Sequence, residues 1–62
     1  MNAMIELLTI KEVSDMLKIS VSGVRRLQYG RHVPFIKVGG SVRFDKNDVI
    51  NYLKKQRVEA IN

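Results

Sequence analysis

The 62-residue chain is expected to form one mainly α-helical domain with a small β-hairpin, in the order α-α-β-β-α. Three observations predict this fold class. Two short amphipathic segments, each preceded by an N-capping residue, follow one another before residue 30. Two β-rich runs then flank a Gly-Gly pair at residues 39–40. Finally, Asp45 precedes a third amphipathic segment.

The first helix is expected to begin at Ile10. Thr9 is a favoured N-cap residue, and Glu12 three positions later completes the sequence pattern of a capping box. Apolar side chains recur along this segment at helical spacing, at Ile10, Val13, Met16 and Leu17. The segment therefore buries one face.

The second helix is expected to run from Val21 to about Tyr29. Ser20 is its N-cap and lies only three residues after Leu17, so the connection is a sharp turn. With about 100° per residue and Val24 at the centre of the buried face, its neighbours on that face are Val21, Leu27 and Gln28. The opposite face carries Ser22, Arg25, Arg26 and Tyr29. That face is either a solvated helix surface or a surface that binds nucleic acid.

The distribution of charge favours nucleic acid. The chain carries 11 Lys and Arg residues against 6 Asp and Glu, a formal net charge of +5. Residues 16–44 contain no acidic residue and six cations, namely Lys18, Arg25, Arg26, Arg31, Lys37 and Arg43. A solvated surface mixes the two signs of charge, whereas a surface that binds a polyanion separates them.

The hairpin is expected over residues 35–44. Gly39 and Gly40 suit a type I′ turn, in which both central residues have positive φ. Its inward face is expected to hold Ile36, Val38, Val42 and Phe44. Lys37 and Arg43 would then lie together on the outward face beside the loop. The hairpin is expected to cover the core and also to bring the backbone N–H groups of its loop close to phosphates.

A third helix is expected after Asp45, its N-cap, with Asp48 at the third helical position. Its packing side is predicted to consist of Val49, Ile50, Tyr52 and Leu53. Its last turn carries Lys54, Lys55 and Arg57. Complementing the helix dipole is the favoured role of these three cations, ahead of DNA contact.

Length and composition restrict the function. A domain of 62 residues leaves little room for a catalytic cleft, and capping explains Asp45 and Asp48, so we expect no enzyme activity. Cysteine is absent and His32 is the only histidine, so neither a metal nor a cofactor is expected. The sequence has no membrane-spanning run and no signal-peptide pattern, which predicts a cytoplasmic location.

The chain is expected to divide into three parts. Residues 1–6 are predicted to be a flexible leader, residues 7–57 a single domain, and residues 58–62 a flexible tail.

The order of these motifs resembles that of the excisionase family of winged helix-turn-helix proteins, which are related to the DNA-binding half of MerR-type regulators. The similarity rests on LLTIKEVSDMLKIS, SGVRRL, VPFIKVGGSVRF and DKNDVINYL, and covers about residues 7–55. Two positions depart from the family's pattern. Lys18 occupies the turn position where the family usually has glycine, so a non-glycine residue is expected to take positive φ. Gly23 lies inside the second helix, which lowers helix stability by up to about 1 kcal/mol relative to alanine; it either lets the helix approach a neighbouring element or only weakens the domain.

The resemblance implies binding of double-stranded DNA, with the second helix in the major groove and the hairpin, or wing, in the adjacent minor groove. Arg25 and Arg26 are the leading candidates for contact with bases or phosphates. Ser20 and Ser22 lie at the helix N-terminus, where hydroxyl and N–H groups can bind phosphate, although Ser20 is first a cap. Tyr29 either contacts the DNA backbone or packs under the turn.

The candidate residues of the wing are Lys37, Gly39, Gly40, Ser41 and Arg43. Lys18 and Arg31 are expected to add to the electrostatic field without making a defined contact.

Three functions remain open. By resemblance, the protein is an excisionase that bends DNA and helps a tyrosine or serine integrase to excise a prophage or mobile element. It would then be encoded by a bacterium or phage, associate with the nucleoid, and assemble cooperatively with further copies on adjacent sites. The second function is a small transcriptional regulator; no long coiled-coil helix follows residue 57, which disfavours a MerR-type dimer. The third is a protein-interaction module for an acidic partner, which the segregation of charge disfavours.

Overall fold

The computed structural model describes residues 4–60. Its elements are β1 (Leu7–Leu8), α1 (Ile10–Leu17), α2 (Val21–Tyr29), β2 (Ile36–Val38), β3 (Ser41–Asp45) and α3 (Lys46–Gln56). The predicted fold class is confirmed, because three helices and a small antiparallel sheet form a winged helix-turn-helix. The predicted leader and tail extend into residues 1–3 and 61–62, which lie outside the described residues.

The sheet has three strands in the order β1-β3-β2, and both pairs are antiparallel. β1 pairs with the end of β3, so that Leu8 lies opposite Phe44. The sequence analysis did not predict β1, because two residues are too few to show the alternation of a strand. The carbonyl oxygen of Glu6, just before β1, accepts a 2.9 Å hydrogen bond from the backbone N–H of Lys46. The segment that enters the domain is thereby attached to the start of α3.

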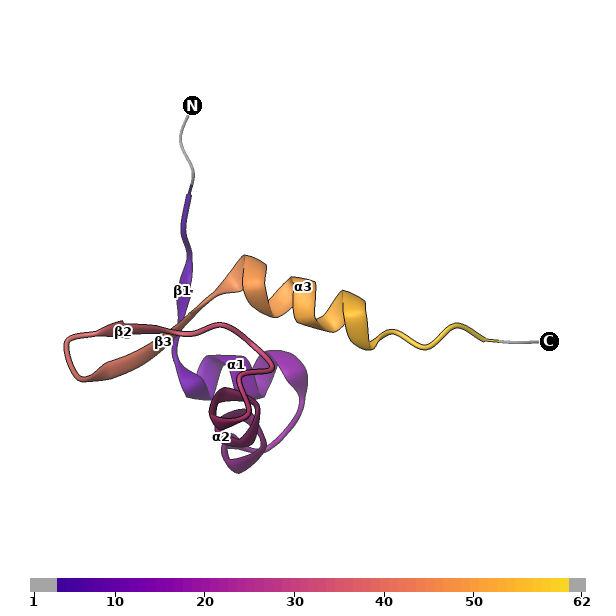
Figure 1. Ribbon diagram of the computed structural model, residues 1–62, viewed down its shortest axis with the longest axis horizontal. Coiled ribbons are helices and arrows are strands. Elements are labelled where there is room, and N and C mark those ends of the chain that lie inside the picture. The colour runs from indigo at the N-terminus through magenta and orange to yellow at the C-terminus, as the bar shows by residue number, and fades with distance from the viewer. Residues whose placement is uncertain (1–3, 61–62) are drawn as a thin grey trace.

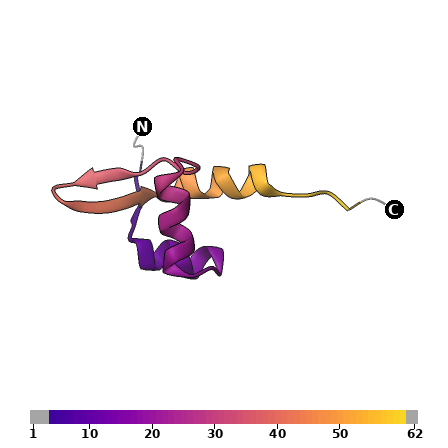
Figure 2. The same cartoon turned by 60° about the horizontal axis from the view of Figure 1, so that its bottom comes forward.

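The hairpin and α3 extend in opposite directions from the body of the molecule (Figure 1). In the view of Figure 2, α2 stands between these two extensions, with α1 at its base. The overall dimensions are 48 × 35 × 19 Å, so the protein is elongated and flat.

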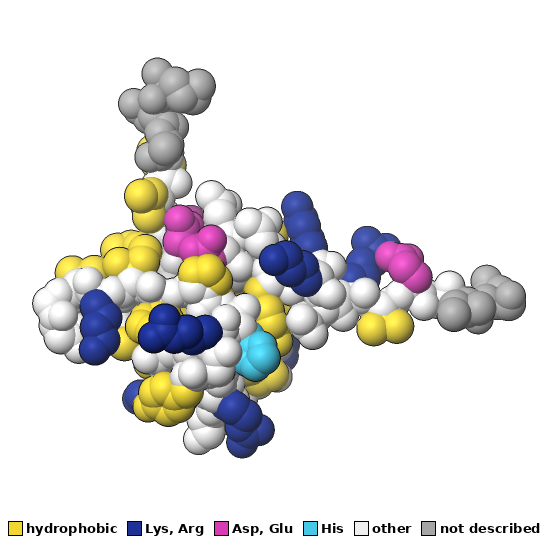
Figure 3. All heavy atoms as spheres, in the orientation of Figure 1, with side chains coloured by type: hydrophobic (Ala, Val, Ile, Leu, Met, Phe, Trp, Pro, Cys, Tyr) yellow, Lys and Arg dark blue, Asp and Glu magenta, His cyan; other side chains and the backbone are white. Residues whose placement is uncertain are grey.

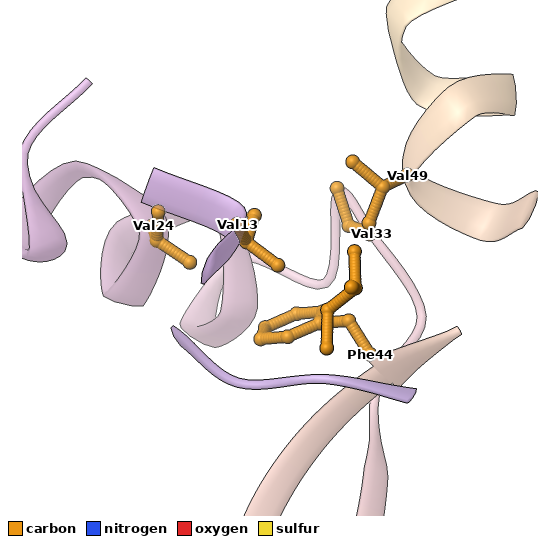
Figure 4. Close-up of a cluster of buried hydrophobic side chains, with 6 residues drawn as sticks. Val13, Val24, Val33, Phe44 and Val49 are labelled. Atoms are coloured by element: carbon orange, nitrogen blue, oxygen red, sulfur yellow. The ribbon is translucent and has the colours of Figure 1, made fainter. Parts of the chain in front are cut away.

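One small core joins all these elements. Its fully buried members are Val13 of α1, Val24 of α2, Val33, Phe44 of β3 and Val49 of α3, and their side chains converge in Figure 4. The buried positions predicted for α1 and α2 are confirmed at their centres, Val13 and Val24. Val33 lies in the loop after α2, where no periodicity could identify it as a core residue.

The predicted N-caps are confirmed. The hydroxyl of Thr9 accepts from the N–H of Glu12 at 3.1 Å, and the Glu12 carboxylate accepts from the N–H of Thr9 at 2.8 Å. The hydroxyl of Ser20 accepts from the N–H of Gly23 at 3.0 Å. Asp45 likewise caps α3, where its carboxylate accepts a backbone N–H at 3.0 Å. Each helix start predicted from the sequence therefore has its capping hydrogen bond.

The predicted faces of the hairpin are wrong. The register pairs Ile36 with Arg43 and Lys37 with Val42. Because paired residues share a face of the sheet, Ile36 and Arg43 project from one face and Lys37 from the other, with Val42. The Val42 side packs against the core, whereas Ile36 and Val38 are 37% and 52% exposed.

The predicted two-residue loop is confirmed, but its turn type differs from the prediction. Val38 pairs with Ser41 across Gly39 and Gly40. Of the two glycines, only Gly39 has a positive φ, at 62°. A positive φ at the first central residue alone fits a type II′ turn, whereas type I′ requires it at both.

α3 buries only part of its predicted packing side. Val49 is fully buried, and Ile50 and Tyr52 are half-buried, but Leu53 is 41% exposed. Leu53 belongs to the second half of α3, which extends away from the body in Figure 1. The assignment of Leu53 to the core is therefore wrong.

Candidate nucleic-acid interface

One exposed face of α2 carries the side chains that the sequence analysis assigned to it. Ser22, Arg25, Arg26 and Tyr29 are all exposed and line one shallow surface depression. Val24, on the opposite face, is buried and fixes the rotation of the helix. Tyr29 is 71% exposed, so it does not pack beneath the following turn.

Ser20 caps α2, so part of the hydrogen-bonding capacity of its hydroxyl is already used. The Ser20 hydroxyl accepts the Gly23 N–H, but a hydroxyl has a second lone pair and its own proton for another partner. The nearest atoms to a Cβ placed on Gly23 belong to Ile19 and Ser20 in the preceding turn, at 3.3–3.6 Å. The Ile19 side chain would have to shift slightly to accept an alanine at this position.

The wing presents two cations in different environments. Lys37 is exposed, on the sheet face that packs against the core. Arg43 projects from the other face and is half-buried; its Nη1 atom donates a 2.8 Å hydrogen bond to the carbonyl oxygen of Val42. The predicted convergence of Lys37 and Arg43 on one outward face is therefore wrong, because a two-residue loop places them in opposite orientations.

The tip of the wing is open. No heavy atom lies within 4 Å of the positions that a Cβ would occupy on Gly39 or Gly40. Ser41 follows the loop and is exposed. The tip of the wing is therefore exposed, and its backbone is not covered by other side chains at these two positions.

The ion pairs of the structure follow the separation of acidic and basic residues seen in the sequence. Within residues 4–60 they are Lys11–Asp15 at 3.0 Å, Lys46–Glu6 at 3.6 Å and Arg57–Glu59 at 3.1 Å. All three use cations outside residues 16–44. The six cations of that acid-free stretch form no ion pair with any described residue.

The surface view agrees with this distribution. On the face seen in Figure 3, Lys and Arg side chains lie over the hairpin and the body, while acidic side chains lie near the N-terminal segment and the C-terminal tail. The candidate interface therefore carries cations that form no ion pair with the described carboxylates.

Two further cations have unusual backbone conformations. Lys18 takes the left-handed conformation expected for it, with φ 60° and ψ 38°. Arg31, just after α2, also has a positive φ, 57°, which the sequence analysis missed. Because glycine adopts positive φ most easily, the sequence favours the left-handed conformation at Gly30, next to Arg31. The φ of Gly30 is instead −79°.

Within residues 4–60, no three or more His, Cys, Asp or Glu side chains come together in a way that could hold a metal ion. The helices of this same part of the chain are all too short or too polar to cross a membrane.

Comparison with known families identifies the class of protein. Residues 7–57 match the family described as Helix-turn-helix domain. The chain belongs to this family, and its membership supports DNA as the partner. Searches of curated proteins and of solved structures found no significant match.

Proposed function

We propose that the protein binds double-stranded DNA in the manner of an excisionase, with α2 in the major groove and the wing in the adjacent minor groove. The observation that best supports this proposal is the set of six unpaired cations in residues 16–44, spread over α2, its flanking turns and the wing. Because no described carboxylate neutralises these cations, each can replace counterions on DNA phosphates.

α2 supplies the sequence-reading part of the proposal. An α-helix with its side chains fits into the major groove, which is about 12 Å wide. Arg25 and Arg26 extend from its exposed face, with Ser22 and Tyr29 beside them. An arginine that reaches O6 and N7 of guanine discriminates that base by about 1–3 kcal/mol, whereas one that reaches phosphate adds affinity without selectivity.

The wing supplies a second contact. The glycine tip offers backbone N–H groups that no side chain covers, and Lys37 adds a charge beside it. Ser20 and Ser41 have exposed hydroxyls for further phosphate contacts. Arg43 can take part if its guanidinium exchanges the Val42 carbonyl for a phosphate oxygen.

In the proposed role, copies of the protein bind adjacent sites and help an integrase to excise a bacterial mobile element or prophage. The basis for this role is the motif order shared with the excisionase family, and its setting would be the cytoplasm. The same interface would also serve a small transcriptional regulator, so the test must separate the two.

Two measurements distinguish an excisionase from a transcriptional regulator. Selection from a randomised duplex library, followed by footprinting, gives the preferred site, the number of copies bound and their spacing. An excision assay with the integrase encoded nearest to the gene then measures the joined chromosomal product with and without the protein. Increased excision supports the proposal; repression of a promoter that carries the site, without any effect on excision, supports a regulator instead. Binding to polyglutamate but not to duplex DNA would favour an acidic protein partner.

A further inference from the structure

Two of the six cations occupy a backbone conformation that side chains rarely adopt. Lys18 and Arg31 are the only non-glycine residues with positive φ in the described part of the chain. The left-handed conformation is unfavourable for any residue with a Cβ, which is why glycine or asparagine usually fills it. Both positions belong to turns that flank α2, one before its N-terminus and one after its C-terminus.

The hydrogen bonds of the α2 terminus require a left-handed residue at position 31. The N–H of His32 donates to the carbonyl of Leu27 at 3.0 Å, and the N–H of Arg31 donates to the carbonyl of Gln28 at 3.1 Å. This pattern is the Schellman motif, in which glycine is the common residue at the position of Arg31. Gly30, one residue earlier, is not the left-handed residue, since its φ is −79°. A Cβ there would lie 2.7 Å from the exposed His32 ring, which would have to move aside.

The turn before α2 is built in a similar way. The N–H groups of Lys18 and Ile19 both donate to the carbonyl of Ser14, the second at 3.1 Å. The left-handed conformation of Lys18 makes this ending of α1 possible. Here too the chain carries a long cationic side chain where glycine would be less strained.

We propose that Lys18 and Arg31 are phosphate-binding residues that hold α2 in the major groove from its two ends. This inference rests on the proposed DNA binding and adds two contacts to it. α2 has nine residues and is about 13–14 Å long. In the proposed docking its axis lies at an angle across a groove about 12 Å wide, which brings cations just beyond its two ends close to the two phosphate backbones that border the groove. Both side chains are exposed, and neither forms an ion pair with a described carboxylate.

Complementing a helix dipole is the competing explanation, since each cation follows the C-terminus of a helix. The two roles differ in the effect of glycine on DNA binding. In either case glycine relieves the strain of the left-handed backbone. If the cations serve only the dipole, glycine also removes a stabilising charge and leaves DNA binding unchanged; if they bind phosphate, glycine weakens DNA binding.

The test measures DNA binding and the melting temperature of the full chain. It compares the wild type with Lys18→Gly, Arg31→Gly and the double variant. Binding is followed by fluorescence anisotropy with a 20-base-pair duplex of mixed sequence between 50 and 300 mM salt. Each phosphate contact contributes about 0.9 to the slope of log affinity against log salt. We expect each single variant to lose about 0.9 of slope, which is about eightfold in affinity at 0.1 M salt, and the double variant about twice that slope. The melting temperatures should equal or exceed that of the wild type.

Three controls make the result specific. Lys54→Gln removes an exposed cation at the last turn of α3 and should leave the slope unchanged, which separates a local contact from the loss of net charge. Lys18→Arg and Arg31→Lys keep the charge and should retain the slope. Unchanged slopes in both glycine variants, or a fall in slope equal to that of Lys54→Gln, overturn the phosphate contacts while leaving the proposed function intact. A wild type that fails to bind the duplex at 50 mM salt overturns both.

Discussion

α2 and the wing both carry exposed cations, but they hold them in different ways. Arg25 and Arg26 lie on one helix face, and a buried valine on the opposite side fixes its orientation. Lys37 and Arg43 lie on opposite faces of a two-stranded extension, and Arg43 is hydrogen-bonded to its own strand. The helix can therefore present both charges to one groove at once, whereas the hairpin presents one charge at a time. We expect α2 to determine affinity and sequence preference and the wing to contribute one phosphate contact.

The largest expected effect on DNA binding comes from the helix. Arg25→Ala and Arg26→Ala should each weaken binding to the selected DNA site by about 1–3 kcal/mol where the arginine reads guanine, and by less where it meets phosphate. Because both side chains are exposed, the melting temperature should stay near that of the wild type. Fluorescence anisotropy titrations measure the DNA affinity, and thermal melting measures the stability.

Arg57→Ala is the matched control for these substitutions. Arg57 is an exposed arginine outside the acid-free stretch and pairs with Glu59 at 3.1 Å. Its removal should leave the affinity nearly unchanged. Unchanged binding in both α2 variants would mean that this helix is not the recognition helix.

The second effect concerns the anchor of the α2 face. Val24→Ala should lower the free energy of unfolding by about 1–4 kcal/mol, because Val24 is a core residue that is only 1% exposed. Leu53→Ala, on the exposed half of α3, should cost less than about 1 kcal/mol, since Leu53 is 41% exposed. Urea denaturation followed by circular dichroism compares the two. Equal losses would contradict the assignment of the buried face.

The contrast between helix and hairpin also explains what could be predicted from the sequence. In α2, one buried position and a period of 3.6 residues determine the whole exposed face, so the prediction for Ser22, Arg25, Arg26 and Tyr29 placed all four correctly. In the hairpin, apolar character alone placed Ile36 and Val38 inward. A two-residue loop pairs residue 38 with 41, which puts even-numbered residues of β2 on the face of odd-numbered residues of β3. The predicted loop length already excluded the predicted faces.

Other features depended on tertiary contacts that no local pattern reveals. β1 is defined only by its pairing with β3, and Val33 is buried only because the loop after α2 folds over the core. Arg31 is left-handed because the Schellman hydrogen bonds from the N–H groups of Arg31 and His32 end α2 at that residue. The DNA contacts of the candidate residues stay predictions, and the substitutions described here test them.

The third effect separates the two cations of the wing. Lys37→Ala should lower the slope of log affinity against log salt by about 0.9, as expected for one lost phosphate contact. Arg43→Ala should lower it by less, because the guanidinium is half-buried and bound to the Val42 carbonyl. Equal decreases would mean that Arg43 leaves that carbonyl when DNA binds. No change in either variant would remove the wing from the interface.

The smallest effect concerns the tip of the wing and uses its two glycines as a matched pair. Gly39→Ala forces a Cβ into a φ of 62°, which should cost about 1–2 kcal/mol of stability. Gly40→Ala meets open space and no positive φ, so it should be neutral or slightly stabilising. A type I′ turn would instead make both substitutions costly, because both central residues would need positive φ. Thermal melting of the two variants therefore distinguishes the turn types. If the tip also approaches phosphates through its backbone, Gly40→Ala should weaken DNA binding without lowering stability, since the added methyl group stands where the DNA must pass.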